Sequence, residues 1–288
     1  MKFGLAVFAT DQGMGPADLA RMAENGGFES LFFPEHTHMP VERTAHFKPE
    51  GGDVPPEYSR TLDPFVALTA AACATRTLRL GTGICLVSQR DPITTAKEVA
   101  TLDHLSGGRL LFGVAAGWNR EELLNHGTDP RRRLGVLADR IRAMRTIWTR
   151  EVASYRGPYV SFERIQSWPK PVQDPLPILI GGNGPTVVDR ILSYGNEWLP
   201  EPAPDLLDRI AEYRERAREA GWADAPVTVY GADPADVPRY AEAGVHRCVF
   251  WLPPGDAEAA RRRAAELSDA LGLAVAASDP RPPEALIM

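Results

Sequence analysis

A glutamate and a histidine adjoin at the point where the second apolar run of the chain ends. The run Ser30-Leu31-Phe32-Phe33 is followed by Pro34, Glu35 and His36. A carboxylate beside an imidazole can move a proton near neutral pH, because histidine titrates closest to that range. His36 and Glu35 are therefore the candidate catalytic residues. The alternative is that both side chains only hydrogen-bond to neighbouring loops.

Residues 37–62, which follow this pair, show no helix or strand pattern. A loop of this length inside a compact domain is typically a binding lid or a disordered segment. The loop mixes aromatic and charged residues, among them Arg43, His46, Phe47 and Tyr58. This mixture favours a lid over the candidate site, from which substrate contacts would come.

A glycine-rich stretch runs directly into a helical pattern later in the chain, as Gly181-Gly182-Asn183-Gly184-Pro185-Thr186. Glycines let backbone N–H groups turn toward a ligand, and a helix N-terminus adds partial positive charge. Gly181, Gly182, Asn183, Gly184 and Thr186 are therefore predicted to bind a phosphate. The alternative is a bare connecting turn. No cysteine and histidine spacing suits a metal, so no metal site is predicted.

Two further apolar runs end in small residues. Gly83 and Ile84 lie in the run Gly81-Thr82-Gly83-Ile84-Cys85, where glycines indicate a bulge, a close backbone approach to a ligand, or tight packing. Cys85 is interpreted as a small buried side chain rather than a nucleophile. Ala116 and Gly117 leave room for a planar group, against which Trp118 could stack. Tight helix packing would explain the same small residues.

The elements that must position these residues follow an alternating order. Nearly all of the apolar runs of strand length are followed by a helical pattern, which predicts a closed parallel (β/α)8 TIM barrel. The runs cover residues 2–9, 30–33, 78–87, 109–115, 177–180, 197–199, 227–230 and 247–252. An open doubly wound sheet is the alternative, but no Gly-x-Gly-x-x-Gly turn follows the first run. Residues 153–162, with Gly157-Pro158 at the centre, predict a small hairpin excursion.

We expect one domain over residues 1–275 and a loose C-terminal tail over 276–288.

Composition excludes several classes of protein. With 32 Lys and Arg against 38 Asp and Glu, the net charge of −6 argues against a nucleic-acid binder. Three well-separated cysteines fit a reduced cytoplasm, and no apolar run approaches the length of a membrane span. The N-terminal run is interpreted as a strand rather than a signal peptide.

Several stretches, taken together and in order, resemble the bacterial luciferase-like flavin oxidoreductases. They are Phe28 to His36, Leu80 to Gly83, Arg90 to Pro92, Thr101 to Arg109, Gly117-Trp118, Trp168 to Val172, Ile178 to Asn183 and Glu197 to Pro200. The resemblance covers residues 1–255. It is greatest to the branch that uses coenzyme F420, an 8-hydroxy-5-deazaflavin.

This resemblance implies a (β/α)8 barrel with a small insertion after the fourth helix, and a homodimer. The bond Gly83–Ile84 matches a non-prolyl cis peptide behind the ring of the cofactor, and Gly181 to Thr186 match its phosphate loop. His36 matches a histidine near the reactive carbon. The glucose-6-phosphate dehydrogenase branch has a carboxylate proton donor where this chain has Trp118, which argues against a sugar-phosphate substrate.

The predicted function is hydride transfer between F420 and a small organic substrate. His36 would act as the proton relay and contribute little to the stability of the fold. One alternative is a monooxygenase that uses reduced FMN from a partner flavin reductase, and another is a non-catalytic flavin-binding protein. Because F420 carries more negative charge than FMN, cations should line its exit path. Arg131, Arg132 and Arg133, with Arg90 and Lys97, are the candidates; a solvated helix face is the alternative for the three consecutive arginines.

Overall fold

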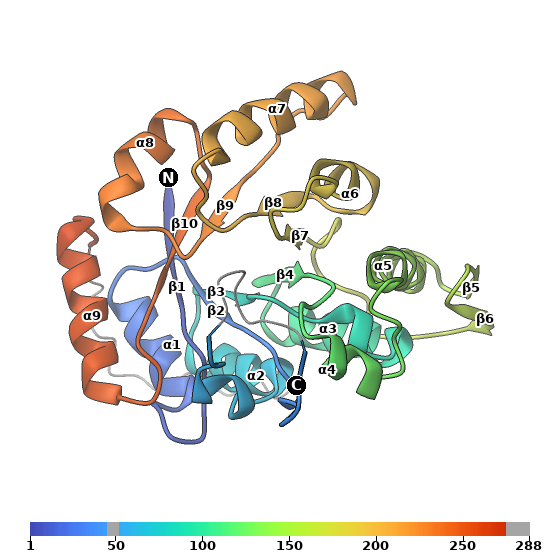
Figure 1. Ribbon diagram of the computed structural model, residues 1–288, viewed down its shortest axis with the longest axis horizontal. Helices are drawn as coiled ribbons and strands as arrows, with labels where there is room; N and C mark the ends of the chain where they lie inside the picture. Colours follow the sequence, from blue (N-terminus) through green and yellow to red (C-terminus); the bar gives the residue numbers. More distant parts are fainter. Residues whose placement is uncertain (45–51, 275–288) are drawn as a thin grey trace.

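Eight parallel strands form a barrel in the part of the chain that the structure describes, which is residues 1–44 and 52–274 of a computed structural model (Figure 1). They are β1 (Lys2–Ala6), β2 (Ser30–Phe33), β3 (Arg79–Thr82), β4 (Leu110–Val114), β7 (Ile178–Gly181), β8 (Glu197–Leu199), β9 (Thr228–Tyr230) and β10 (Arg247–Trp251). Their order is β8-β7-β4-β3-β2-β1-β10-β9. A parallel bridge between Trp198 and Val227 brings β8 to β9. The predicted TIM barrel is confirmed.

Helices alternate with these strands and cover the outside of the barrel (Figure 1). They are α1 (Pro16–Asn25), α2 (Pro64–Ala74), α3 (Pro92–Leu105), α4 (Arg120–Asn125), α5 (Arg133–Thr149), α6 (Val187–Tyr194), α7 (Leu206–Glu219), α8 (Val237–Glu242) and α9 (Ala257–Ala270). Aspartates cap several of their first turns. The Asp63 carboxylate accepts hydrogen bonds from the backbone of α2, and Asp91 does so for α3, each directly before a proline.

The predicted hairpin follows α5 and projects from the barrel beside that helix (Figure 1). It consists of β5 (Ala153–Arg156) and β6 (Ser161–Ile165), which pair antiparallel. The Asp139 carboxylate of α5 accepts hydrogen bonds from the Tyr155 hydroxyl at 2.6 Å and from the Val160 amide at 2.9 Å. A buried carboxylate therefore ties this small insertion to the barrel.

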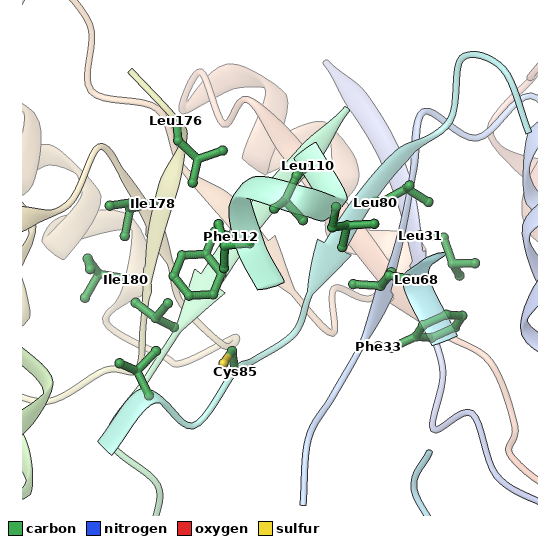
Figure 2. Packing of buried hydrophobic residues seen from close by; sticks show 14 of the residues in the cluster. Leu31, Phe33, Leu68, Leu80, Cys85, Leu110, Phe112, Leu176, Ile178 and Ile180 are labelled. Carbon is green, nitrogen blue, oxygen red and sulfur yellow. The ribbon is translucent and has the colours of Figure 1, made fainter. Parts of the chain in front are cut away.

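The core has two layers because side chains alternate along each strand. Leu31 and Phe33 point outward to the helices, and Figure 2 shows them in the same packed cluster as Leu68 of α2. Phe32 points into the barrel, where it joins a smaller apolar cluster with Leu111, Leu179 and Val249. A Cβ at Gly81 would overlap the Phe32 ring, so tight packing explains that glycine.

Strand β3 is shorter than its apolar run. The prediction of a strand over 78–87 is wrong beyond Thr82, where the chain turns through loop residues into a short 3-10 helix at Val87–Gln89. Cys85 and Leu86 in this loop are buried, so the apolar run continues although the strand has ended. Burial of Cys85 raises the pKa of its thiol well above the usual value, which agrees with a small buried side chain.

A buried arginine closes the seam of the barrel where β8 and β9 share one bridge. Arg247 opens β10 and donates to both carboxylate oxygens of Glu29, at 2.8 and 2.9 Å. It also donates to the Thr228 hydroxyl at 2.8 Å and to Glu197 Oε1 at 3.3 Å. Burial alone would raise the pKa of Glu29, but its bonds to Arg247 and the charge of Arg247 lower that pKa to about 2. The cluster thus joins β8, β9 and β10 to the residue before β2.

Some predictions concern residues outside the described ranges. His46, Phe47 and the C-terminal tail 276–288 lie there, and the division into one domain and a tail stays a prediction. Within the described ranges, no helix combines the length and the apolar character that crossing a membrane requires.

Candidate active site

A cavity of about 590 Å³ opens at the carboxyl ends of the barrel strands. Its volume is typical of small-molecule sites. The predicted site residues that line it are Glu35, His36, Gly83, Ile84, Ala116, Gly117, Trp118, Gly181, Gly182, Gly184 and Thr186. They meet because the loops after parallel barrel strands gather at one end. The side chain of Asn183 points elsewhere and is treated below.

The part of the cavity wall that the loop after β3 forms consists of backbone atoms. The peptide bond Gly83–Ile84 is cis, as the resemblance implied. The Tyr230 hydroxyl donates to the Gly83 carbonyl at 2.7 Å, and a Cβ at Gly83 would overlap the Tyr230 ring. A glycine is therefore required here by a close approach of backbone and ring at the edge of the cavity.

His36 is paired with a carboxylate from another element. Its Nδ1 lies 2.9 Å from Glu122 Oε2, and Glu122 is fully buried on α4. The other Glu122 oxygen accepts from the Thr37 amide at 3.3 Å. An ionised carboxylate can only accept, so Nδ1 carries the proton and Nε2 is the ring nitrogen left for a ligand. Sequence reasoning missed Glu122, which looks like an ordinary acidic residue in a first helical turn.

Glu35 has a different role from the one expected. Its Oε1 accepts from Arg90 Nε at 2.5 Å, and its Oε2 accepts from the Leu86 amide at 2.6 Å. Arg90 also pairs with Asp63 and Glu98. The expectation that Glu35 partners His36 is wrong, because adjacent residues of an extended chain project in opposite directions. Glu35 instead holds the loop that carries the Gly83–Ile84 bond.

The glycine-rich loop after β7 forms one side of the cavity. Arg209 donates to the carbonyls of Asn183 at 2.6 Å and Gly184 at 3.1 Å. Because N–H and C=O point in opposite directions across a trans peptide, the Gly184 N–H faces away from Arg209. The Asn183 side chain bonds to the Glu201 backbone at 2.8 and 3.2 Å rather than lining the cavity. That asparagine therefore braces the loop.

An arginine that the sequence did not single out completes this side. Arg190 of α6 lines the cavity with Gly184 and Thr186. Its Nε is buried and has no hydrogen-bond partner within residues 1–44 and 52–274. A buried N–H without a hydrogen-bond partner is costly unless a ligand satisfies it. We call Gly184, Thr186, Arg190 and the nearby Arg133 the anion cradle.

The five cations proposed for the exit path of the cofactor lie in different surroundings. Arg133 lines the cavity, whereas Arg131 and Arg132 are exposed and do not line it. Arg131 is paired with Asp129 at 2.9 Å. Arg90 is committed to the carboxylates around Glu35, and Lys97 donates to the Trp168 carbonyl. The prediction for Arg90 and Lys97 is therefore wrong, because position near a strand end does not fix the direction of a side chain.

Aromatic rings cover the rest of the cavity. Tyr58, from the described part of the 37–62 loop, lies 4.5 Å from Phe8 and 5.1 Å from His36 between ring centroids. Trp118 meets His36 edge-on at 6.0 Å. Burial raises the pKa of Tyr58 to about 12, with the charges of Glu201 and Glu57 adding to the rise. The loop thus places an aromatic residue over the candidate proton relay.

The sequence of the chain matches a known family over most of its length. The family described as luciferase-like monooxygenase matches residues 10–278. The chain belongs to this family. An uncharacterized protein of Mycobacterium tuberculosis is 40% identical over 265 residues, which is 90% of this chain and 94% of that protein. An F420-dependent hydroxymycolic acid dehydrogenase of the same species is 25% identical over 207 residues, which is 70% of this chain and 53% of that protein.

Solved luciferase-like structures share the fold. The monooxygenase RslO1 from Streptomyces bottropensis superposes with a TM-score of 0.75 at 21% identity, covering 94% of this chain and 98% of its own. An F420-dependent secondary alcohol dehydrogenase, in complex with an F420-acetone adduct, gives 0.71 at 19% identity, covering 94% and 99%. At these identities the solved structures show that the chain shares their fold.

Proposed function

We propose that this luciferase-like protein is an F420-dependent oxidoreductase that transfers a hydride between the deazaflavin and a small organic substrate. The observation that carries the proposal is one cavity that holds both the anion cradle and the buried His36–Glu122 pair. The first suits the phosphate of a cofactor, and the second suits a proton that moves with a hydride. The F420-dependent relative supports the choice of cofactor.

The residues present fit such a cofactor. Two groups can donate hydrogen bonds to an anion. They are the Nε of Arg190, which has no partner among the described residues, and the N–H of Gly184, which faces away from Arg209. Small residues at Ala116 and Gly117, which line the cavity together with Gly83, leave space for a planar ring. When bound there, a deazaflavin supplies a carbon that accepts or gives a hydride.

His36 is suited to manage the accompanying proton. Glu122 accepts from Nδ1–H, so Nε2 can take the hydroxyl proton of an alcohol or return it to a carbonyl. The buried carboxylate stabilises the imidazolium that forms and fixes the ring orientation, as in other histidine–carboxylate pairs. Tyr58 and Trp118 pack on the histidine and limit the access of water.

Direct titration with each cofactor tests this proposal. We expect F420 to bind at least tenfold more tightly than FMN, a difference of about 1.4 kcal/mol. Its affinity should fall as salt rises, because screening shortens to roughly 3 Å at 1 M. Absorbance and fluorescence titrations give both dissociation constants. Tight FMN binding without F420 binding would overturn the proposal.

A luciferase-like monooxygenase that uses reduced FMN from a partner reductase is the second candidate. The fold match to the monooxygenase RslO1 favours it, and the anion cradle would also suit the phosphate of FMN. Oxygen consumption with reduced FMN, compared with anaerobic turnover of F420, separates the two. The homodimer and the cytoplasmic location stay predictions.

Replacing Arg190 with glutamine should weaken cofactor binding at least tenfold, about 1.4 kcal/mol, because the cradle loses a positive charge and the N–H donor of Nε. The matched control is Arg216→Gln. Arg216 is an exposed arginine that pairs with Asp189, and Asp189 lies on α6, the same helix as Arg190. That control should bind the cofactor like the wild type. Equal affinities in all three proteins would show that Arg190 does not contact the phosphate.

A further inference from the structure

Glu201 is a charged residue of the cavity that neither the anion cradle nor the His36 pair uses. It follows β8 by way of Pro200, and its backbone is held by the Asn183 side chain at 2.8 and 3.2 Å. Its carboxylate has no ion pair or hydrogen bond within the described residues. Glu35, the other glutamate lining the cavity, is neutralised by Arg90. Glu201 therefore places a carboxylate without a direct ion-pair partner, among the described residues, at the wall of the cavity.

The electrostatic surroundings of Glu201 agree with this position. Glu201 is exposed at the mouth of the cavity, and desolvation by the surrounding protein still raises its pKa, with no neighbouring cation to oppose that rise. Its charge reaches two phenols across the cavity. Burial and then Glu201 raise the pKa of Tyr58 to about 12, and the same causes raise the pKa of Tyr230. The Glu201 carboxylate therefore lies near enough to both phenols to act on them.

Four aromatic rings line the same cavity, one after β1, one from the 37–62 loop and one at the end of each of β9 and β10. Phe8 and Trp251 stack with centroids 5.4 Å apart and an interplanar angle of 9°. Trp251 meets Tyr230 edge-on at 5.1 Å, and Tyr58 lies 4.5 Å from Phe8. The faces of such rings carry negative charge and attract cations, most strongly where water is excluded. A carboxylate beside these rings strengthens that attraction and repels an anionic group.

We propose that Glu201, with Phe8, Tyr58, Tyr230 and Trp251, binds an organic cation, so that the substrate carries an amino or quaternary ammonium group. This inference rests on the proposed function, since it names the substrate class of the same cavity. The anion cradle takes the cofactor, and the cationic group of the substrate lies against Glu201. Acidic substrates and phosphate esters are disfavoured at this end.

A pair of isosteric probes tests the proposal without knowledge of the natural substrate. Choline and 3,3-dimethylbutan-1-ol have nearly the same shape, but only choline carries a positive charge. Calorimetric titration of the F420-loaded protein should show choline binding at least tenfold more tightly. Glu201→Gln should abolish this preference. The matched control Glu57→Gln removes a carboxylate near Tyr58 that does not line the cavity, and it should keep the preference.

Equal affinity for the two probes, failure of both to bind, or a preference that survives Glu201→Gln would each overturn the proposal. Titration of the wild type with F420 on the same preparation keeps the two proposals distinct. If F420 binds but choline shows no preference, the substrate class is wrong and the cofactor assignment stands. If F420 does not bind, the proposed function fails, and the two probes are then titrated against the protein without cofactor.

Discussion

Replacing His36 with alanine is expected to reduce kcat by about 10²–10⁴-fold, the usual contribution of a general acid or base. His36 is the residue that offers a free ring nitrogen to the cavity while a buried carboxylate holds the other. The measurement is F420 absorbance under anaerobic conditions with a matched pair of alcohol and carbonyl substrates. Wild-type turnover in this variant would reduce His36 to a packing residue.

The structure changes the expectation for stability in the same variant. Glu122 is fully buried, so among the described residues the removal of His36 leaves the Thr37 amide as the one donor to its carboxylate. An unsatisfied buried group costs about 1–3 kcal/mol. We expect the melting temperature to fall in His36→Ala and to recover in the double variant with Glu122→Gln, whereas turnover stays low. Recovery of both would show that the loss of turnover came from destabilisation.

Replacing Arg247 with methionine is expected to lower the free energy of unfolding by about 3–5 kcal/mol, the cost of breaking a buried ion pair on one side. Glu29 would lose both hydrogen bonds, and Glu197 and Thr228 would lose their shared donor. The seam between β8 and β9 would then keep backbone contacts such as the Trp198–Val227 bridge and the bond from the Tyr230 amide to the Pro200 carbonyl. Urea unfolding near neutral pH measures the loss, and Arg131→Met is the exposed control, with little change expected.

The same arginine predicts a pH dependence. The pKa of Glu29 falls from 4.5 to about 2 in the folded protein, so its ion pair stabilises the fold fully above pH 4.5. This contribution is lost as pH falls from there to about 2, because the proton then binds the unfolded chain more readily. The stability of Arg247→Met should vary less over that interval. An identical pH slope in both proteins would show that Glu29 does not depend on Arg247.

Features that depend on local sequence were predictable. Apolar runs of strand length, separated by capped helices, predicted the barrel, and a barrel by itself brings the strand ends together. The cavity residues from His36 to Thr186 were found in this way. The strand ending at Thr82 was predicted too long, because apolar character reports burial in a loop as readily as in a strand.

The sequence by itself determined the fold, the end of the barrel that carries the site, and the glycine-rich loop. The tertiary structure decided which charges meet. Glu122 is the partner of His36 across 86 residues of chain, and Arg247 reaches Glu29 across 218. Periodicity acts over a few residues, whereas an ion pair depends on where two distant elements dock and on the direction in which each side chain leaves its backbone. For the same reason, Arg190 faces the cavity, whereas Arg90 points to the carboxylate of Glu35.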